Sequence, residues 1–129
     1  MSQLLAGKTN MTREDIVRLA AVRCNATILG RGQFTVYSST IAGFGVKFPN
    51  WRFPLVIDLD NGEIHYDNYE GSWGDIAELS QFKQAYTAEL VRDAAKKMGH
   101  SVTESVTDTG EIRLVVGVDN NDASSKISF

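Results

Sequence analysis

The side chains best suited to chemistry lie in one short stretch where polar and apolar residues alternate. That stretch carries Asp58, Asp60, Glu63, His65 and Asp67. Carboxylates beside an imidazole can bind a divalent cation, so Asp58, Glu63 and His65 are candidate metal ligands. Their spacing is not that of an EF-hand loop, because Gly62 follows Asp58 too closely. A solvated sheet face and an acidic surface that contacts a partner are the alternative interpretations.

Two tryptophans flank the acidic stretch, in Trp51-Arg52-Phe53 and in Gly71-Ser72-Trp73-Gly74. Core packing is the default role of a tryptophan, and an exposed interface anchor is the alternative. If the stretch contacts a partner, the residues expected at the contact are Asp58, Asp60, Glu63, Asp67, Glu70, Trp51 and Trp73.

The sequence carries no pattern typical of a catalytic nucleophile or a cofactor site. It has no Gly-x-Ser-x-Gly elbow, and two histidines are all that a triad could draw on. Cys24 follows Arg23 at the expected end of a helix, where the dipole disfavours a thiolate, which indicates a buried structural thiol. The glycine pairs around Arg31 and Phe44 lack the strand–loop–helix context of a phosphate loop. We therefore expect no catalytic residue and no cofactor.

Charge is unevenly distributed along the chain. Residues 1–52 carry a net charge of +5, residues 53–82 carry −7 without any Lys or Arg, and residues 83–129 carry −1. The overall charge of −3 argues against nucleic-acid binding, which favours a basic excess. No apolar run approaches the roughly 20 residues of a membrane-spanning helix. The start resembles no secretory leader and the single cysteine allows no internal disulfide, so we expect a cytoplasmic protein.

The acidic stretch reads as a β-hairpin around Asn61-Gly62, the preferred pair for a two-residue type I′ turn. That turn would pair Asp60 with Glu63, Leu59 with Ile64 and Asp58 with His65. The apolar residues then share one face, and the carboxylates and His65 share the other.

Two helices should position this hairpin. An apolar stripe over residues 12–25 predicts a first helix with Thr12 as its N-cap and Asn25 at its end. A second stripe over residues 75–98 predicts a long helix that ends before Gly99. Strand patterns fill residues 26–68. The order indicates an α+β fold with one twisted antiparallel sheet of about five or six strands and both helices on one face. Residues 1–118 would form one domain and residues 119–129 a polar tail.

The last two strands have an informative register. A three-residue loop, Asp108-Thr109-Gly110, pairs Val106 with Ile112 and Val102 with Val116, which places the valines on one face. The following strand, residues 111–118, is long and apolar and would make a poor free edge. We expect it to lie inside the sheet or to meet a second copy in a two-fold homodimer, unless the tail covers it.

The C-terminal half resembles a known family. The residues that carry the resemblance are Tyr86, the segment from Lys97 to Glu104 and the segment from Thr109 to Val116, with Lys8-Thr9-Asn10-Met11 near the start. They are similar to the uncharacterised "hypothetical chloroplast reading frame thirty-five" proteins of cyanobacteria, algal plastids and bacteriophages. This chain departs from the family at Ala85-Tyr86-Thr87-Ala88 and at His100. The resemblance implies the same element order, and the host cytoplasm for a phage-encoded member, but no activity.

Three functional hypotheses follow. The first is a non-enzymatic protein-binding module, an accessory or regulator of a larger machine such as an AAA+ ATPase. The second is a metal- or small-ligand-dependent enzyme that uses Asp58, Glu63 and His65. The third is an acidic phage inhibitor of a host nucleic-acid or defence enzyme. None of the three involves a membrane.

Overall fold

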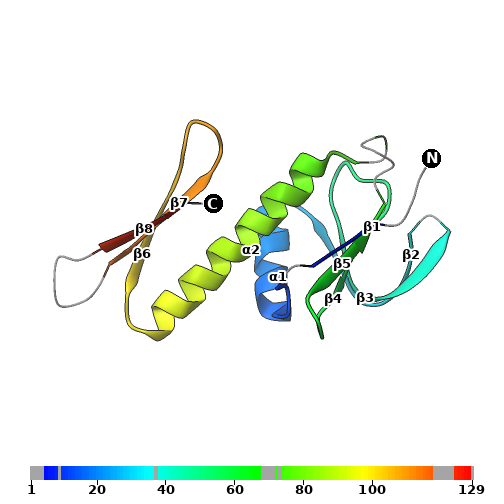
Figure 1. The fold of residues 1–129 in the computed structure, drawn as a ribbon, viewed down its shortest axis with the longest axis horizontal. Helices are drawn as coiled ribbons and strands as arrows, with labels where there is room; N and C mark the ends of the chain where they lie inside the picture. Colours follow the sequence, from blue (N-terminus) through cyan, green and yellow to red (C-terminus); the bar gives the residue numbers. More distant parts are fainter. Residues whose placement is uncertain are drawn as a thin grey trace. The chain divides into compact units, whose positions relative to one another are not determined.

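The computed structural model describes residues 5–8, 10–36, 38–67, 72, 74–117 and 124–128, of which 5–8 and 124–128 by their backbone alone. Helices and antiparallel strands are both present, so the α+β class is confirmed. The chain divides into two compact units, unit 1 over Met1–Phe82 and unit 2 over Lys83–Phe129. Their elements are drawn in Figure 1.

Unit 1 is built on a five-stranded antiparallel sheet in the order β1-β5-β4-β3-β2. Its elements are β1 (Leu5–Lys8), α1 (Glu14–Arg23), β2 (Thr27–Val36), β3 (Ser39–Lys47), β4 (Leu55–Asp58), β5 (Glu63–Tyr66) and the first turns of α2 (Ile76–Lys97). Phe44 of β3 pairs with Ile57 of β4, and Ile57 pairs with Ile64 of β5. These three buried side chains therefore share one sheet face and form the centre of the core.

Both helices contribute apolar side chains to unit 1. Ile16, Val17, Ala20 and Ala21 recur at helical spacing on α1 and are buried. Leu79 and Phe82 of α2 are buried as well. The Phe82 ring centroid lies 5.4 Å from that of Phe48.

Unit 2 contains the remainder of α2 and a three-stranded antiparallel sheet in the order β6-β7-β8. The strands are β6 (Ser101–Val106), β7 (Ile112–Gly117) and β8 (Ser124–Ser128). Leu114 is fully buried in β7. Arg92 of α2 donates to Glu104 of β6, with Nη2 3.0 Å from Oε1, which ties the helix to the sheet.

The single sheet expected from the sequence is wrong, because the strands form two sheets. Hairpin registers depend on neighbouring residues, whereas the joining of hairpins into sheets depends on packing between distant segments. The segment expected to be a polar tail contains β8, which pairs with β7 along its length.

The position of β7 bears on the expected homodimer. β7 lies between β6 and β8, as one of the two expected arrangements required. The apolar strand is therefore not a free edge in need of a second copy. Self-association remains a prediction, but a free β7 edge no longer supports it.

Both helices are followed by the left-handed residues that the sequence predicts, but the first helix does not begin with the predicted cap. Asn25 has a φ of 55° and Gly99 has a φ of 76°, and both follow a helix in the left-handed conformation. The N–H of Ala26 donates to the carbonyl of Ala21 at 2.9 Å, which is the long hydrogen bond of a Schellman motif. The Thr12 cap is wrong, because the N-cap is Arg13 and has no side-chain capping bond.

Candidate functional site

The acidic hairpin residues lie at the turn between β4 and β5. Asp58 is paired directly with Glu63, and Val56 is paired with His65. Cross-strand partners project to the same side, so Asp58, Glu63 and His65 share a sheet face, as the sequence predicts. Two carboxylates directly opposite each other repel, which disfavours the hairpin unless another role retains them.

The turn itself differs from the expected two-residue loop. The last pair is Asp58 with Glu63, so residues 59–62 form a four-residue loop. Asp58 Oδ1 accepts the Asp60 N–H at 3.0 Å, and Asn61 Oδ1 accepts the Glu63 N–H at 2.9 Å. Gly62 takes the left-handed conformation, with a φ of 78°. These side-chain bonds replace a tight Asn-Gly turn and shift the register by two residues.

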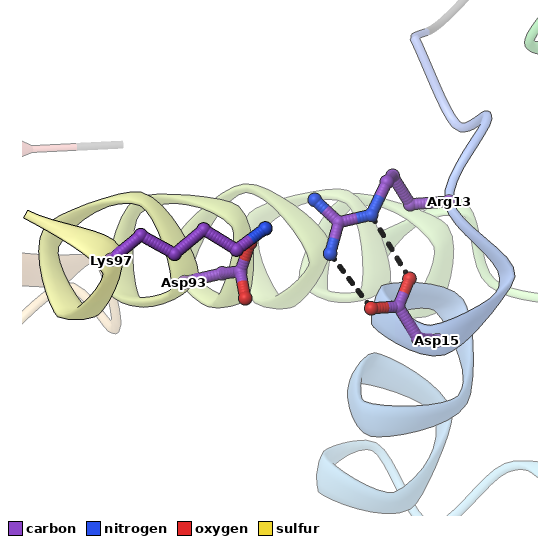
Figure 2. A network of polar contacts seen from close by, with 4 residues as sticks. All are labelled: Arg13, Asp15, Asp93 and Lys97. Carbon is purple, nitrogen blue, oxygen red and sulfur yellow. Dashed lines mark hydrogen bonds and ion pairs between the residues drawn. The ribbon is translucent and has the colours of Figure 1, made fainter.

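Asp58 and Asp60 have no ion-pair partner within the described part of the chain, whereas Glu63 lies directly opposite Lys8 of β1. Asp15 on α1, by contrast, is bound by Arg13 at 2.7 Å, and Asp93 on α2 by Lys97 at 2.9 Å; Figure 2 shows both pairs. Asp58 and Asp60 therefore make the hairpin end locally acidic.

An open depression of about 270 Å³ lies beside the turn. Its lining residues come from β2, β3, β4 and the turn, namely Arg31, Ala42, Gly43, Phe44, Ile57, Asp58, Leu59 and Asp60. Phe44, Ile57 and Leu59 are buried, so little of their surface is accessible from the depression, while Asp60 is exposed. The accessible lining is mainly polar, and the carboxylates at its border favour the charged head of a basic side chain.

Arg31 is the cation among the lining residues, and it already has a partner. Its Nε donates to Glu14 Oε1 at 2.9 Å, and Arg18 donates to the other oxygen of the same carboxylate. Hydrogen bonds from Arg18 and Arg31 hold the pKa of Glu14 below its usual value. The Arg18 guanidinium also lies 5.1 Å from the Phe44 ring centroid. Glu14 is a single carboxylate shared by two guanidinium groups, so it offsets the charge of Arg31 only in part. The depression is lined by Asp58 and Asp60 against this one partly offset cation.

The metal-site interpretation finds no geometric support. In the ranges that the structure describes, no three His, Cys, Asp or Glu side chains are arranged to hold a metal ion. Sharing one sheet face therefore does not bring Asp58, Glu63 and His65 together as ligands.

Two of the expected partner-binding residues are in the core. Trp51 is 2% exposed, its Nε1 donates to the Asp75 carbonyl at 2.9 Å, and its ring meets Phe48 edge-on at 4.9 Å. It is a packing residue and not an exposed anchor. Asp67 is also 2% exposed, so its carboxylate cannot form part of an outer acidic surface. Glu70 and Trp73 lie outside the described residues.

Cys24 is half-buried at the end of α1. Burial raises the pKa of its thiol, and Glu78 raises it further while Arg23 lowers it. A thiol with a raised pKa is a poor nucleophile at neutral pH. This agrees with the structural role that the sequence indicates.

The sequence does not identify Arg31, Phe44 or Ile57 as lining a depression. Phe44 and Ile57 lie in strong strand patterns, and such patterns do not distinguish a side chain deep in the core from one that also lines a depression. The expected two-residue turn places Leu59 in a strand, whereas in the structure Leu59 is a buried residue of the four-residue turn.

The chain matches no protein-family model, and no curated protein or solved structure is similar to it. None of the helices in the described ranges is long and apolar enough to cross a membrane.

Proposed function

We propose that the chain is a non-enzymatic protein-binding module that binds a basic segment of its partner at the β4–β5 turn. The observation that carries the proposal is the depression bordered by Asp58 and Asp60, carboxylates without an ion-pair partner in the described part of the chain. The charged head of a lysine or arginine side chain at this depression would neutralise these carboxylates.

The charge distribution supports the same proposal. Residues 53–82 carry −7, so the field near the turn attracts a basic partner from beyond contact distance. Electrostatic steering of this kind raises association rates and makes binding sensitive to salt. Opposed carboxylates that cost hairpin stability are retained because they serve recognition. The partner could be a larger machine such as an AAA+ ATPase, or a host nucleic-acid or defence enzyme inhibited by an acidic phage protein.

Affinity capture from an extract of the source organism tests the proposal. The variant Asp58→Asn/Asp60→Asn removes two charges while an Asn side chain can still accept the Asp60 backbone N–H. The matched control Asp108→Asn/Glu111→Gln removes two charges from the exposed turn between β6 and β7. We expect one basic partner to be retained by the wild type and the control, and lost with the first variant or at high salt.

Equal capture by both variants would contradict the proposal, and so would the absence of any partner above background. The wild type should also bind more slowly as ionic strength rises, since steering is screened over about 10 Å at 0.1 M salt. An association rate that is indifferent to salt would remove the electrostatic argument.

A further inference from the structure

One side of β3 is only partly paired. β3 pairs with β2 along its whole length, from Ser39 to Lys47. Its other side pairs with β4 only from Phe44 to Val46. Among the described strands, therefore, residues 39–43 are paired on one side only. On the other side Gly43 lies against Ile57 of β4 without being paired with it.

This free edge lacks the features that normally protect one. Natural edge strands carry charged residues, prolines or bulges that prevent another strand from pairing. The outer strand β2 has a register shift between Ile28 and Gly30 and carries Arg31, and the outer strand β6 carries Glu104. Residues 39–43 read Ser-Thr-Ile-Ala-Gly, with neither a charge nor a proline.

The depression beside the turn borders this same edge. Ala42 and Gly43 line it from β3, and Asp58, Leu59 and Asp60 line it from the end of β4. A Cβ at Gly43 would lie 2.7 Å from the Ile57 carbonyl oxygen, so glycine is required where β4 leaves β3. The depression therefore begins where the β3–β4 ladder stops.

We propose that a basic peptide binds in extended conformation along residues 39–43 and continues the ladder that β4 leaves unfinished. This inference rests on the proposed function and adds its binding mode. Backbone hydrogen bonds to β3 would supply affinity, and a lysine or arginine directed at Asp58 and Asp60 would supply specificity. Arg31 lines the same depression, but it donates to Glu14, and Asp58 and Asp60 together outnumber it.

Charge decides between a basic peptide and a second copy of this chain. Pairing of two β3 edges around a two-fold axis would bring Asp58, Asp60 and Arg31 of both copies toward one interface, where four carboxylates outnumber two guanidinium groups. Like charges across an interface cost several kcal/mol. A basic peptide brings the opposite charge to the same place.

The test uses peptides selected against the whole chain. A display library of random 12-residue peptides is panned on the folded protein, and the recovered sequences are synthesised with a free backbone and with N-methyl groups at alternate residues. We expect basic peptides whose affinity falls at least tenfold on N-methylation, which leaves the charge unchanged. The affinity of the unmethylated peptides should also fall at least tenfold for the Asp58→Asn/Asp60→Asn protein. It should fall less than twofold for the Asp108→Asn/Glu111→Gln protein. Amide hydrogen exchange at residues 39–43 should slow when the unmethylated peptide binds.

The outcomes separate the two proposals. N-methylated peptides that bind as well as unmethylated ones, or unchanged exchange at residues 39–43, would overturn strand addition and leave the acidic contact standing. Failure to recover basic peptides, or equal binding to both double variants, would overturn the acidic contact as well. A doubled mass without peptide, together with protected amides at residues 39–43, would assign the edge to a second copy and overturn the peptide.

Discussion

Burial separates the chemistry-bearing residues of unit 1 into two sets. Asp60 is exposed and Asp58 is half-buried, so both can meet a partner. Asp67 and Trp51 have the residue types of an interface but are 2% exposed, and they serve the core instead. Alternation along a strand predicts which side a residue takes, but it does not show how deeply neighbouring segments cover that side.

At the residue scale, the packing of Trp51 leads to a prediction about Gly74. A Cβ at Gly74 would lie 2.5 Å from the Trp51 ring, which is fixed by Phe48 and by its hydrogen bond to Asp75. We expect Gly74→Ala to lower the free energy of unfolding by about 1–3 kcal/mol through overpacking. Urea denaturation followed by tryptophan fluorescence measures the change.

Gly32→Ala is the matched control. The nearest atom to a Cβ at Gly32 is Phe34 Cζ at 3.6 Å, which is an ordinary contact. We expect this variant to remain within about 0.5 kcal/mol of the wild type. Equal losses in both variants would show that the Trp51 ring does not restrict Gly74.

The thiol of Cys24 gives a prediction about pH. Burial raises its pKa above that of the unfolded chain. The unfolded state therefore loses its proton first as pH rises, and the contribution of this group to stability is lost between the unfolded and the folded pKa. We expect the free energy of unfolding to decline above about pH 8.5, the usual thiol pKa. The decline should be smaller in Cys24→Ser, and identical pH profiles would contradict the assignment.

At the element scale, the sequence predicts local geometry well wherever one residue type has a single good conformation. The register of β6 with β7 is as expected, with Val106 opposite Ile112, and Gly110 has the left-handed φ of 86° that the three-residue loop requires. Leu114 on the valine face of that hairpin is fully buried, whereas Val106 at the end of β6 is 66% exposed, so the expected buried face is only partly covered. Here the valine pattern and Gly110 both predict the same register of β6 with β7.

The β4–β5 hairpin shows where such reasoning fails. Asn61-Gly62 favours a two-residue turn, but Asp58 and Asn61 form side-chain bonds that stabilise a four-residue loop. The resulting shift of two residues keeps every strand side chain on its expected face, because the side-chain period is two. The acidic face was therefore predictable, whereas the depression created by the longer turn was not.

The end of α2 allows a further prediction at this scale. Gly99 closes the helix with a φ of 76°, a conformation that costs other residues about 1–2 kcal/mol. We expect Gly99→Ala to lose about 1 kcal/mol of stability, and Gly99→Asn to lose less because Asn tolerates this region. Circular dichroism during urea unfolding measures both. Lys96→Ala, one turn earlier on the exposed surface, should change stability by less than about 0.5 kcal/mol.

At the scale of the whole molecule, the division into unit 1 and unit 2 concerns how the chain unfolds. α2 belongs to both units, with Leu79 buried in its unit 1 portion, while Leu114 is buried in unit 2. Sheets of three strands are near the lower limit of independent stability. Local unfolding of unit 2 should therefore require less free energy than unfolding of unit 1.

Two leucine substitutions test this division. Leu→Ala at a buried site costs about 2–5 kcal/mol, and the loss is felt by the amides that open together with that site. We expect Leu114→Ala to accelerate hydrogen exchange in β6 and β7 while β3, β4 and β5 keep their protection. Leu79→Ala should accelerate exchange in β3, β4 and β5. Composition and length predict instead a single domain over residues 1–118. One cooperative core would open as a whole, so either substitution would then accelerate exchange in both sheets equally.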